Sequence, residues 1–199
     1  MGNAKTANNA SARKRRADAE RNTRAIIHAA LEALASDPDV SMAEIARRAG
    51  VVRATIYMHF PTRDALLDAV QEYATAQVAE AIRSAEPDRG EPREALERVI
   101  HATWSQLSQF HGVLAINMGR LSVKELHRRH LPMTTQFIPL LERGQAAGVF
   151  RSDVSPEWLI AVIRAIVHLA STELQAGRLS QAEVERTMST TALAAVGAT

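Results

Sequence analysis

The chain has 199 residues, of which 46% are hydrophobic, 23% are charged and none is cysteine. This length suffices for a sizeable core, and the lack of cysteine excludes disulfides and thiolate metal sites. No apolar run reaches the ~18 residues that a membrane span needs, and the N-terminus lacks the apolar core of a signal peptide. We therefore expect a cytoplasmic, soluble protein that does not bind a membrane.

Charge is unevenly distributed, although the net charge is only +2. Residues 1–64 hold eleven Lys and Arg against seven Asp and Glu, and the remaining residues hold thirteen against fifteen. A basic N-terminal part on a slightly acidic remainder indicates a polyanion-binding site. A charged tail that only aids solubility would give the same composition.

The sequence predicts an all-α protein, because no stretch alternates like a strand and glycine and proline gather at a few breaks. Residues 1–17 are polar and basic and are expected to form a disordered arm. Ser41 with Glu44, and Ser180 with Glu183, have the spacing of reciprocal capping boxes. Helices are expected at about 18–36, 41–49, 52–59, 62–85, 93–110, 113–128, 132–147, 156–176 and 181–196.

Residues 41–60 have the spacing of a helix-turn-helix: two short helices are joined by a turn that contains Gly50. Six apolar side chains can bury against the first helix: Ile45, Ala46, Ala49, Val51, Ile56 and Phe60. A purely structural helical hairpin would share this apolar spacing, but it would not need many hydrogen-bond donors on one short exposed face.

The outward side chains of the third helix suit contact with double-stranded DNA. Arg53 can offer a bidentate fork to guanine. Apolar side chains there can touch a thymine methyl group, and hydroxyl and imidazole groups can donate to phosphates. The apolar candidates are Ala54 and Met58, and the phosphate candidates are Thr55, Tyr57 and His59.

The run Thr55-Ile56-Tyr57-Met58-His59-Phe60, followed by Pro61-Thr62-Arg63, resembles the signature of the TetR family over residues 20–70. The resemblance implies that the third helix is the recognition helix and that Arg63 contacts a phosphate. Two departures are Val52, where relatives often carry a capping serine worth ~1 kcal/mol, and a short 36–40 segment without the common glycine-aromatic pair. The candidate DNA-binding residues are Ser41, Arg53, Ala54, Thr55, Tyr57, Met58, His59 and Arg63.

The basic run Arg13-Lys14-Arg15-Arg16 has two interpretations. Such an arm could enter an adjacent minor groove. Alternatively, it is a solvated charge run that gives only non-specific attraction, which is the preferred interpretation.

The segment 156–176 is apolar nearly all round and must be buried on more than one side. Pairing it with 181–196 across a two-fold axis would bury it in a homodimer. The segment 147–153 and the helix after it are similar to the TetR family's entry into its dimerisation helices. The alternative is that both helices complete the core of one monomer.

A ligand pocket in the C-terminal part would be mostly apolar with a few convergent polar groups. Ordinary core and surface positions would fit the same residues. We expect no metal, cofactor or catalytic site, because no phosphate-binding glycine loop, cysteine nucleophile or paired-carboxylate motif is present. The candidate ligand-binding residues are Trp104, Phe110, Asn117, Met118, Met133, Phe137, Arg164 and His168.

The sequence therefore predicts an N-terminal helix-turn-helix domain at 18–64 and a helical regulatory and dimerisation domain at 65–199. The expected function is transcriptional regulation, most simply repression, by a homodimer that binds a palindromic operator and is released by a small, mainly apolar ligand. The alternative is a DNA-binding protein of the same fold without small-molecule control, such as a nucleoid or division factor. An enzyme would need a catalytic cluster that the sequence does not contain.

Overall fold

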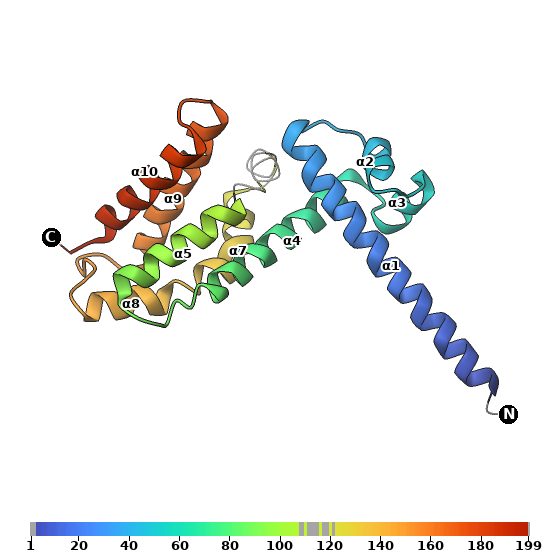
Figure 1. Cartoon of the computed structure of the whole chain (residues 1–199), viewed down its shortest axis with the longest axis horizontal. Helices are drawn as coiled ribbons and strands as arrows, with labels where there is room; N and C mark the ends of the chain where they lie inside the picture. Colours follow the sequence, from blue (N-terminus) through green and yellow to red (C-terminus); the bar gives the residue numbers. More distant parts are fainter. Residues whose placement is uncertain (1–2, 108–109, 111–115, 117–119, 121, 199) are drawn as a thin grey trace. The chain divides into compact units, whose positions relative to one another are not determined.

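The computed structural model describes residues 3–107, 110, 116, 120 and 122–198. These residues hold nine α-helices and, outside them, one isolated bridge between Phe150 and Gly197 (Figure 1). The fold is all-α, as the sequence predicts. The chain divides into two compact units, the first formed chiefly by residues up to Tyr73 and the second by residues from Ala74. This boundary falls inside a helix and later than the 64/65 boundary that the sequence indicates.

The first unit is a small bundle built on one helical face. Its helices are α1 (Asn3–Ser36), α2 (Met42–Arg48), α3 (Arg53–His59) and the beginning of α4 (Arg63–Ser84). Ile26, Ala30 and Leu34 are spaced by four residues along α1, and each is 0% exposed. Ile45 of α2 and Ile56 of α3 are buried with them. This apolar core fixes the orientation of the two short helices within the unit.

The turn between α2 and α3 depends on a glycine. Gly50 has φ +68°, a left-handed conformation that side chains with a Cβ rarely adopt. The N–H of Gly50 donates to the carbonyl of Arg47 at 3.2 Å, and the N–H of Val51 donates to that of Ala46 at 3.0 Å. This pair of bonds satisfies the last carbonyls of α2 and ends the helix.

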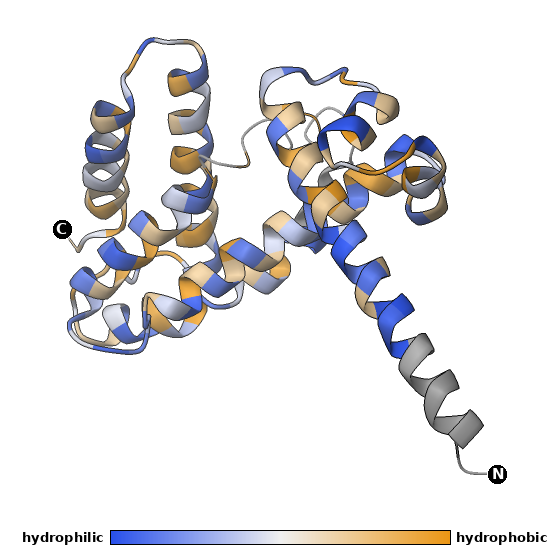
Figure 2. Ribbon diagram, turned by 45° about the vertical axis from the view of Figure 1, so that its right-hand side comes forward, coloured by the Kyte–Doolittle hydropathy of each residue, from blue (hydrophilic) through white to orange (hydrophobic). Residues whose placement is uncertain are grey.

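The expected disordered arm is helical instead. α1 begins at Asn3, so residues 3–17 continue the helix that the sequence places at 18–36. No glycine or proline interrupts the chain from Asn3 to Ser36, and the arm is rich in alanine, lysine and arginine, all strong helix formers. Figure 2 shows the hydrophilic character of α1 beyond the apolar part that packs in the first unit. The low hydrophobicity of this segment suggested disorder, but hydrophobicity and helix propensity are separate properties, and the helix propensity here is high.

The second unit contains the end of α4 and five further helices. These are α5 (Pro92–Leu107), α7 (Val123–Thr134), α8 (Ile138–Ala146), α9 (Pro156–Gln175) and α10 (Gln181–Val196). α9 and α10 form an antiparallel hairpin (Figures 1 and 2). The capping box of Ser180 and Glu183 that starts α10 is confirmed. None of the described helices combines the length and the apolar composition needed to cross a membrane.

The sequence predicts a break between helices just before Pro132, and this boundary is wrong. α7 begins after Ser122, whose hydroxyl accepts from the N–H of Glu125 at 3.2 Å. Pro132 lies inside α7 rather than ending it. The break comes at residues 135–137, and the N–H of Phe137 donates to the carbonyl of Thr134 at 3.1 Å. A proline near the end of a helix removes one backbone bond but does not force the helix to stop at that residue.

Candidate nucleic-acid interface

One side of α3 is anchored and the other side faces solvent. Ile56 is 0% exposed, and Phe60 just after the helix is buried too. On the opposite side Tyr57 is 39% exposed and Met58 is 72% exposed. Such a helix presents a fixed surface to a partner, because its orientation is set by the buried side. The exposed candidates from the sequence are Arg53, Ala54, Tyr57 and Met58.

Arg53 and Tyr57 form a pair on this exposed surface. The guanidinium carbon of Arg53 lies 5.6 Å from the centroid of the Tyr57 ring, a cation–π distance. The two residues are one helical turn apart, which brings their side chains together. The ring therefore restricts where the guanidinium fork points, while both groups stay accessible.

His59 and Thr55 are less accessible than the sequence suggests, and both are half-buried. His59 Nδ1 lies 3.1 Å from Thr23 Oγ1 on α1. Nε2 of His59 is buried and has no hydrogen-bond partner in the part of the chain that the structure describes. In this geometry the ring ties α3 to α1, and it does not present the phosphate donor that the sequence predicts.

Arg63 also differs from its expected role. Its guanidinium donates to the carbonyl oxygens of Pro38, at 2.6 Å, and Val40. The side chain therefore clamps the loop between α1 and α2. The phosphate contact that the family resemblance implies would require Arg63 to leave these carbonyls.

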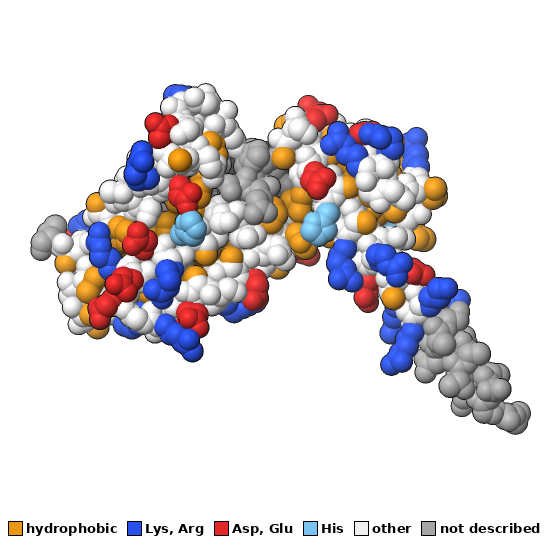
Figure 3. All heavy atoms as spheres, viewed as in Figure 1, with side chains coloured by type: hydrophobic (Ala, Val, Ile, Leu, Met, Phe, Trp, Pro, Cys, Tyr) orange, Lys and Arg blue, Asp and Glu red, His pale blue; other side chains and the backbone are white. Residues whose placement is uncertain are grey.

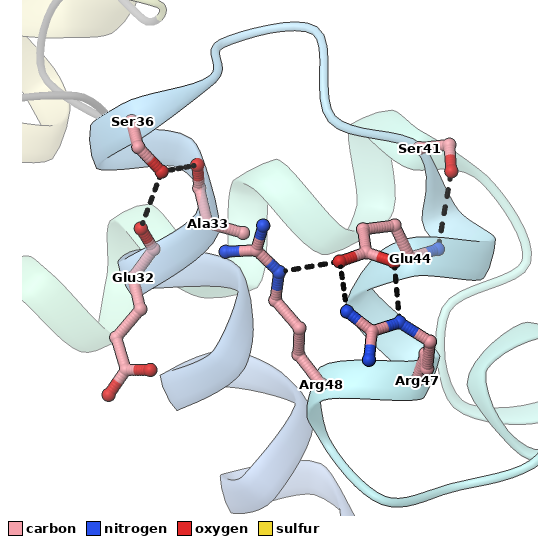
Figure 4. Close-up of polar contacts among 7 residues, drawn as sticks. All are labelled: Glu32, Ala33, Ser36, Ser41, Glu44, Arg47 and Arg48. Atoms are coloured by element: carbon pink, nitrogen blue, oxygen red, sulfur yellow. Dashed lines mark hydrogen bonds and ion pairs between the residues drawn. The ribbon is translucent and has the colours of Figure 1, made fainter.

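An ion-pair cluster lies along α2 (Figure 4). The hydroxyl of Ser41 accepts from the N–H of Glu44 at 3.2 Å, so Ser41 caps α2. The expected reciprocal capping box is wrong, because Glu44 instead accepts hydrogen bonds from Arg47 at 2.7 and 2.8 Å and from Arg48 at 2.8 Å. These bonds, first from Arg47 and then from Arg48, lower the pKa of Glu44 to about 2.

Arg47 and Arg48 are functional candidates that sequence reasoning missed. The Arg47 side chain is 74% exposed, and its cluster with Glu44 carries a net charge of +1. The signal that could have identified the two residues is a basic pair in the last turn of the first helix of a helix-turn-helix. Their bonds to Glu44 hold the side chains against α2.

The candidate ligand residues divide into two groups. Trp104, Phe110 and Phe137 are buried in the second unit, and Met133 is half-buried. Arg164 and His168 are exposed on α9, so their expected convergence with the apolar group is wrong for the single chain. Two further candidates, Asn117 and Met118, lie outside the described residues.

Trp104 has an unusual environment for an indole. Its side chain is 1% exposed, yet its Nε1 has no hydrogen-bond partner among the described residues. A buried N–H without a partner costs ~1–3 kcal/mol of stability. An acceptor brought to this position would remove that cost.

An open groove of about 1210 Å³ lies in the second unit between α4, α5 and α10. It is lined largely by polar side chains, and His101 Nδ1 lies 2.5 Å from Glu185 Oε1 between α5 and α10. None of the six candidate ligand residues that the structure describes lines it. The groove was not predictable from the sequence, because α10 lies far along the chain from α4 and α5.

Family models match both units. Residues 26–70 match bacterial regulatory proteins of the tetR family, and residues 92–195, slightly more than half of the chain, match the tetracyclin repressor-like C-terminal domain.

Named relatives agree with these matches. The HTH-type transcriptional repressor LfrR of Mycolicibacterium smegmatis is 37% identical over 83 residues, which cover 42% of this chain and 44% of the relative. This match thus spans less than half of the relative's length. The HTH-type transcriptional regulator NfxB of Pseudomonas aeruginosa is 29% identical over 132 residues, 65% of this chain and 70% of the relative.

Solved structures resemble the fold over nearly the whole chain. The crystal structure of LfrR in complex with proflavine has a TM-score of 0.72 at 24% identity and covers 89% of this chain and 97% of that chain. The TetR transcription regulatory protein from Mycobacterium vanbaalenii has a TM-score of 0.60 at 30% identity, with coverages of 88% and 97%. The N-terminal and C-terminal matches both point to one family and together cover most of the chain. The chain therefore belongs to the TetR family of bacterial regulatory proteins, which are transcriptional regulators and not enzymes.

Proposed function

We propose that this regulator is a repressor that binds a near-palindromic DNA operator as a homodimer and leaves it when a small molecule binds the second unit. The observation that carries the DNA-binding part is α3. Its apolar side is buried, and its exposed side combines the Arg53 fork, the Tyr57 hydroxyl and the apolar Met58. Such a helix suits a major groove, where donor and methyl patterns distinguish all four base pairs.

Arg53 is the proposed base-reading residue. Replacing it with alanine should cost ~1–3 kcal/mol on the operator and relax sequence preference. The Tyr57 hydroxyl is the proposed donor to a phosphate, and Tyr57→Phe removes it while keeping the ring beside Arg53. Because phosphates carry no sequence information, this variant should bind operator and scrambled duplex more weakly by the same factor. Titrations of both variants on both duplexes check this assignment. Equal losses on the two duplexes for Arg53→Ala would contradict it.

The proposed dimer contact uses α9 and α10. Trp158 is 61% exposed and Leu169 is 58% exposed, although both are large and apolar. Together with Val162 and Ala165 they have the i, i+4, i+7, i+11 spacing of one helical seam. A second copy related by a two-fold axis would cover this seam and supply the second recognition helix that a palindrome needs.

Ligand control is supported by two observations. The related repressor LfrR was solved in complex with proflavine, a small organic molecule. In the part of the second unit that the structure describes, the buried Trp104 Nε1 has no acceptor. We infer a mainly apolar effector that carries a hydrogen-bond acceptor for this N–H.

The proposed switch is a shift between two dimer states. α4 is one continuous helix that begins in the first unit and ends in the second, so it connects the recognition helix to the regulatory core. The effector must bind the state that cannot engage DNA more tightly, since equal affinity for both states shifts nothing. A coupling of ~1–3 kcal/mol would act reciprocally, so that DNA weakens effector binding by the same factor.

Tryptophan fluorescence tests the switch. In a Trp158→Phe background, Trp104 is the sole tryptophan of the chain. We expect proflavine, used as the probe, to quench its fluorescence and to bind the protein more weakly with operator than with an equal concentration of scrambled duplex, which corrects for dye that stacks in DNA. Equal binding with the two duplexes would contradict ligand control and favour the DNA-binding protein without a small-molecule switch.

A further inference from the structure

The N-terminal end of α1 is an exposed, strongly basic helix. Arg13, Lys14, Arg15 and Arg16 follow one another there, and each is exposed. No acidic residue precedes Asp18 in the chain, and Asp18 itself pairs with Arg21 at 3.2 Å. Figure 3 shows Lys and Arg side chains gathered along this part of α1. Among the described residues, none of these four side chains forms an ion pair.

The arm is fixed relative to the recognition helix. The contact between Thr23 and His59 joins α1 to the last residue of α3. Both helices belong to the first unit, so this contact defines the position of the basic N-terminal part of α1 relative to α3. α1 then runs from Thr23 back to Arg13, ten residues or ~15 Å at the rise of an α-helix.

Helical spacing decides which charges share the side of α1 that meets α3. Arg16 precedes Thr23 by seven residues, or two turns, and lies on the same face. At ~100° per residue, Arg13 and Arg15 flank that face and Lys14 points to the opposite side. The side of the arm that continues the recognition surface therefore carries three arginines.

We propose that Arg13, Arg15 and Arg16 bind phosphates of the DNA backbone beside the major groove that α3 occupies. The inference rests on the proposed DNA binding. Entry into the minor groove requires an extended arm, because a helix ~10–12 Å across does not fit a groove ~6 Å wide. Contact along the phosphates suits a rigid helix, and arginine matches phosphate with its planar fork.

This contact adds affinity without sequence preference. Each phosphate neutralised by a cationic side chain releases counterions, so the slope of log K against log salt changes by ~0.9 per contact. Between 50 and 200 mM salt this corresponds to about a threefold difference in affinity per phosphate. The three arginines should therefore add about two to three to the steepness of the slope.

The test measures this slope for the full chain on one duplex selected by the wild type and on one scrambled duplex. Arg16→Gln should flatten the slope by about one on both duplexes, and Arg16→Lys should restore it. Lys14→Gln is the matched control: it removes the same unit charge from the opposite side of the helix and should leave the slope nearly unchanged. Far-UV circular dichroism confirms that each variant keeps its helix content.

The outcomes are distinct. An unchanged slope for Arg16→Gln and for the triple variant Arg13→Gln, Arg15→Gln, Arg16→Gln would overturn the proposal. An equal loss for Lys14→Gln and Arg16→Gln would also overturn it and indicate a solvated charge run that attracts DNA from any side. If the wild type binds neither duplex, the proposed function itself fails, and that result is separate from any effect of the arm.

Discussion

At the scale of single residues, two side chains of the family signature hold the recognition surface in place. His59 contacts Thr23, and the Arg63 guanidinium binds the carbonyls of Pro38 and Val40. These contacts connect α3 to α1 and the start of α4 to the loop before α2. A short helix reads DNA only if its orientation is fixed, so such contacts serve recognition without touching a base.

Arg63 gives a direct test of this structural role. Arg63→Ala should lower the free energy of unfolding by ~1–3 kcal/mol, because it leaves two carbonyls without a charged donor. Urea denaturation measures the change, and Arg83→Ala, which removes an exposed ion pair with Glu80, is the control with an expected change near zero. Unchanged stability with weaker binding to all DNA would show instead that Arg63 is a phosphate contact.

At the scale of helices, local chemistry decides what the sequence can predict. The cap of Ser180 with Glu183 and the turn at Gly50 were predictable, because their conformations depend on neighbouring residues. The break near Pro132 was not, because the same residue type can end a helix or lie inside its last turns. The polarity of residues 3–17 predicted a disordered arm, whereas the helix that they form depends on the helix propensity of alanine, lysine and arginine.

α8 contains a glycine whose role is packing. A Cβ at Gly144 would lie 1.9 Å from Cδ2 of Phe150, which is 1% exposed. The carbonyl of Gly144 also accepts the N–H of Phe150 at 3.1 Å. The phenyl ring therefore sits directly on the helix backbone, and no larger residue fits there.

Gly144→Ala should destabilise the protein by ~1–3 kcal/mol through overpacking, even though alanine favours helix by about 1 kcal/mol at an open position. Ala146→Gly, an exposed change at the last residue of the same helix, should cost less than about 1 kcal/mol and is the control for the propensity effect. Thermal unfolding compares the two variants with the wild type. A higher melting temperature for Gly144→Ala would contradict the packing role of the glycine.

At the scale of the whole molecule, the recognition surface was easier to predict than the pocket. The surface lies within one stretch of sequence, and its periodicity separates Ile56 from Tyr57 and Met58. The pocket candidates came from several helices. Arg164 and His168 are four residues apart and so share one face of α9, but this spacing could not show that the face is exposed.

The exposed seam of α9 predicts how the dimer can be broken. Leu169→Lys places a charge in a seam that a second copy is proposed to cover, so it should weaken dimerisation at least tenfold, equivalent to ~1.4 kcal/mol or more. His168→Lys adds a charge at the neighbouring exposed position, away from the seam, and should have little effect. Sedimentation velocity over a concentration series measures both. Equal dimer stability for Leu169→Lys and the wild type would place the contact elsewhere.

In the proposed complex, two copies of α3 bind one near-palindromic site. Selection of bound duplexes from random double-stranded DNA, followed by sedimentation of the complex, tests this arrangement. We predict enrichment of a sequence with two inverted half-sites, whose centres lie about 34–36 Å apart or slightly more, and two chains per duplex. Enrichment should be lost with Arg53→Ala. The account would be contradicted by a wild-type protein that enriches no sequence, or that binds its preferred duplex as a single chain.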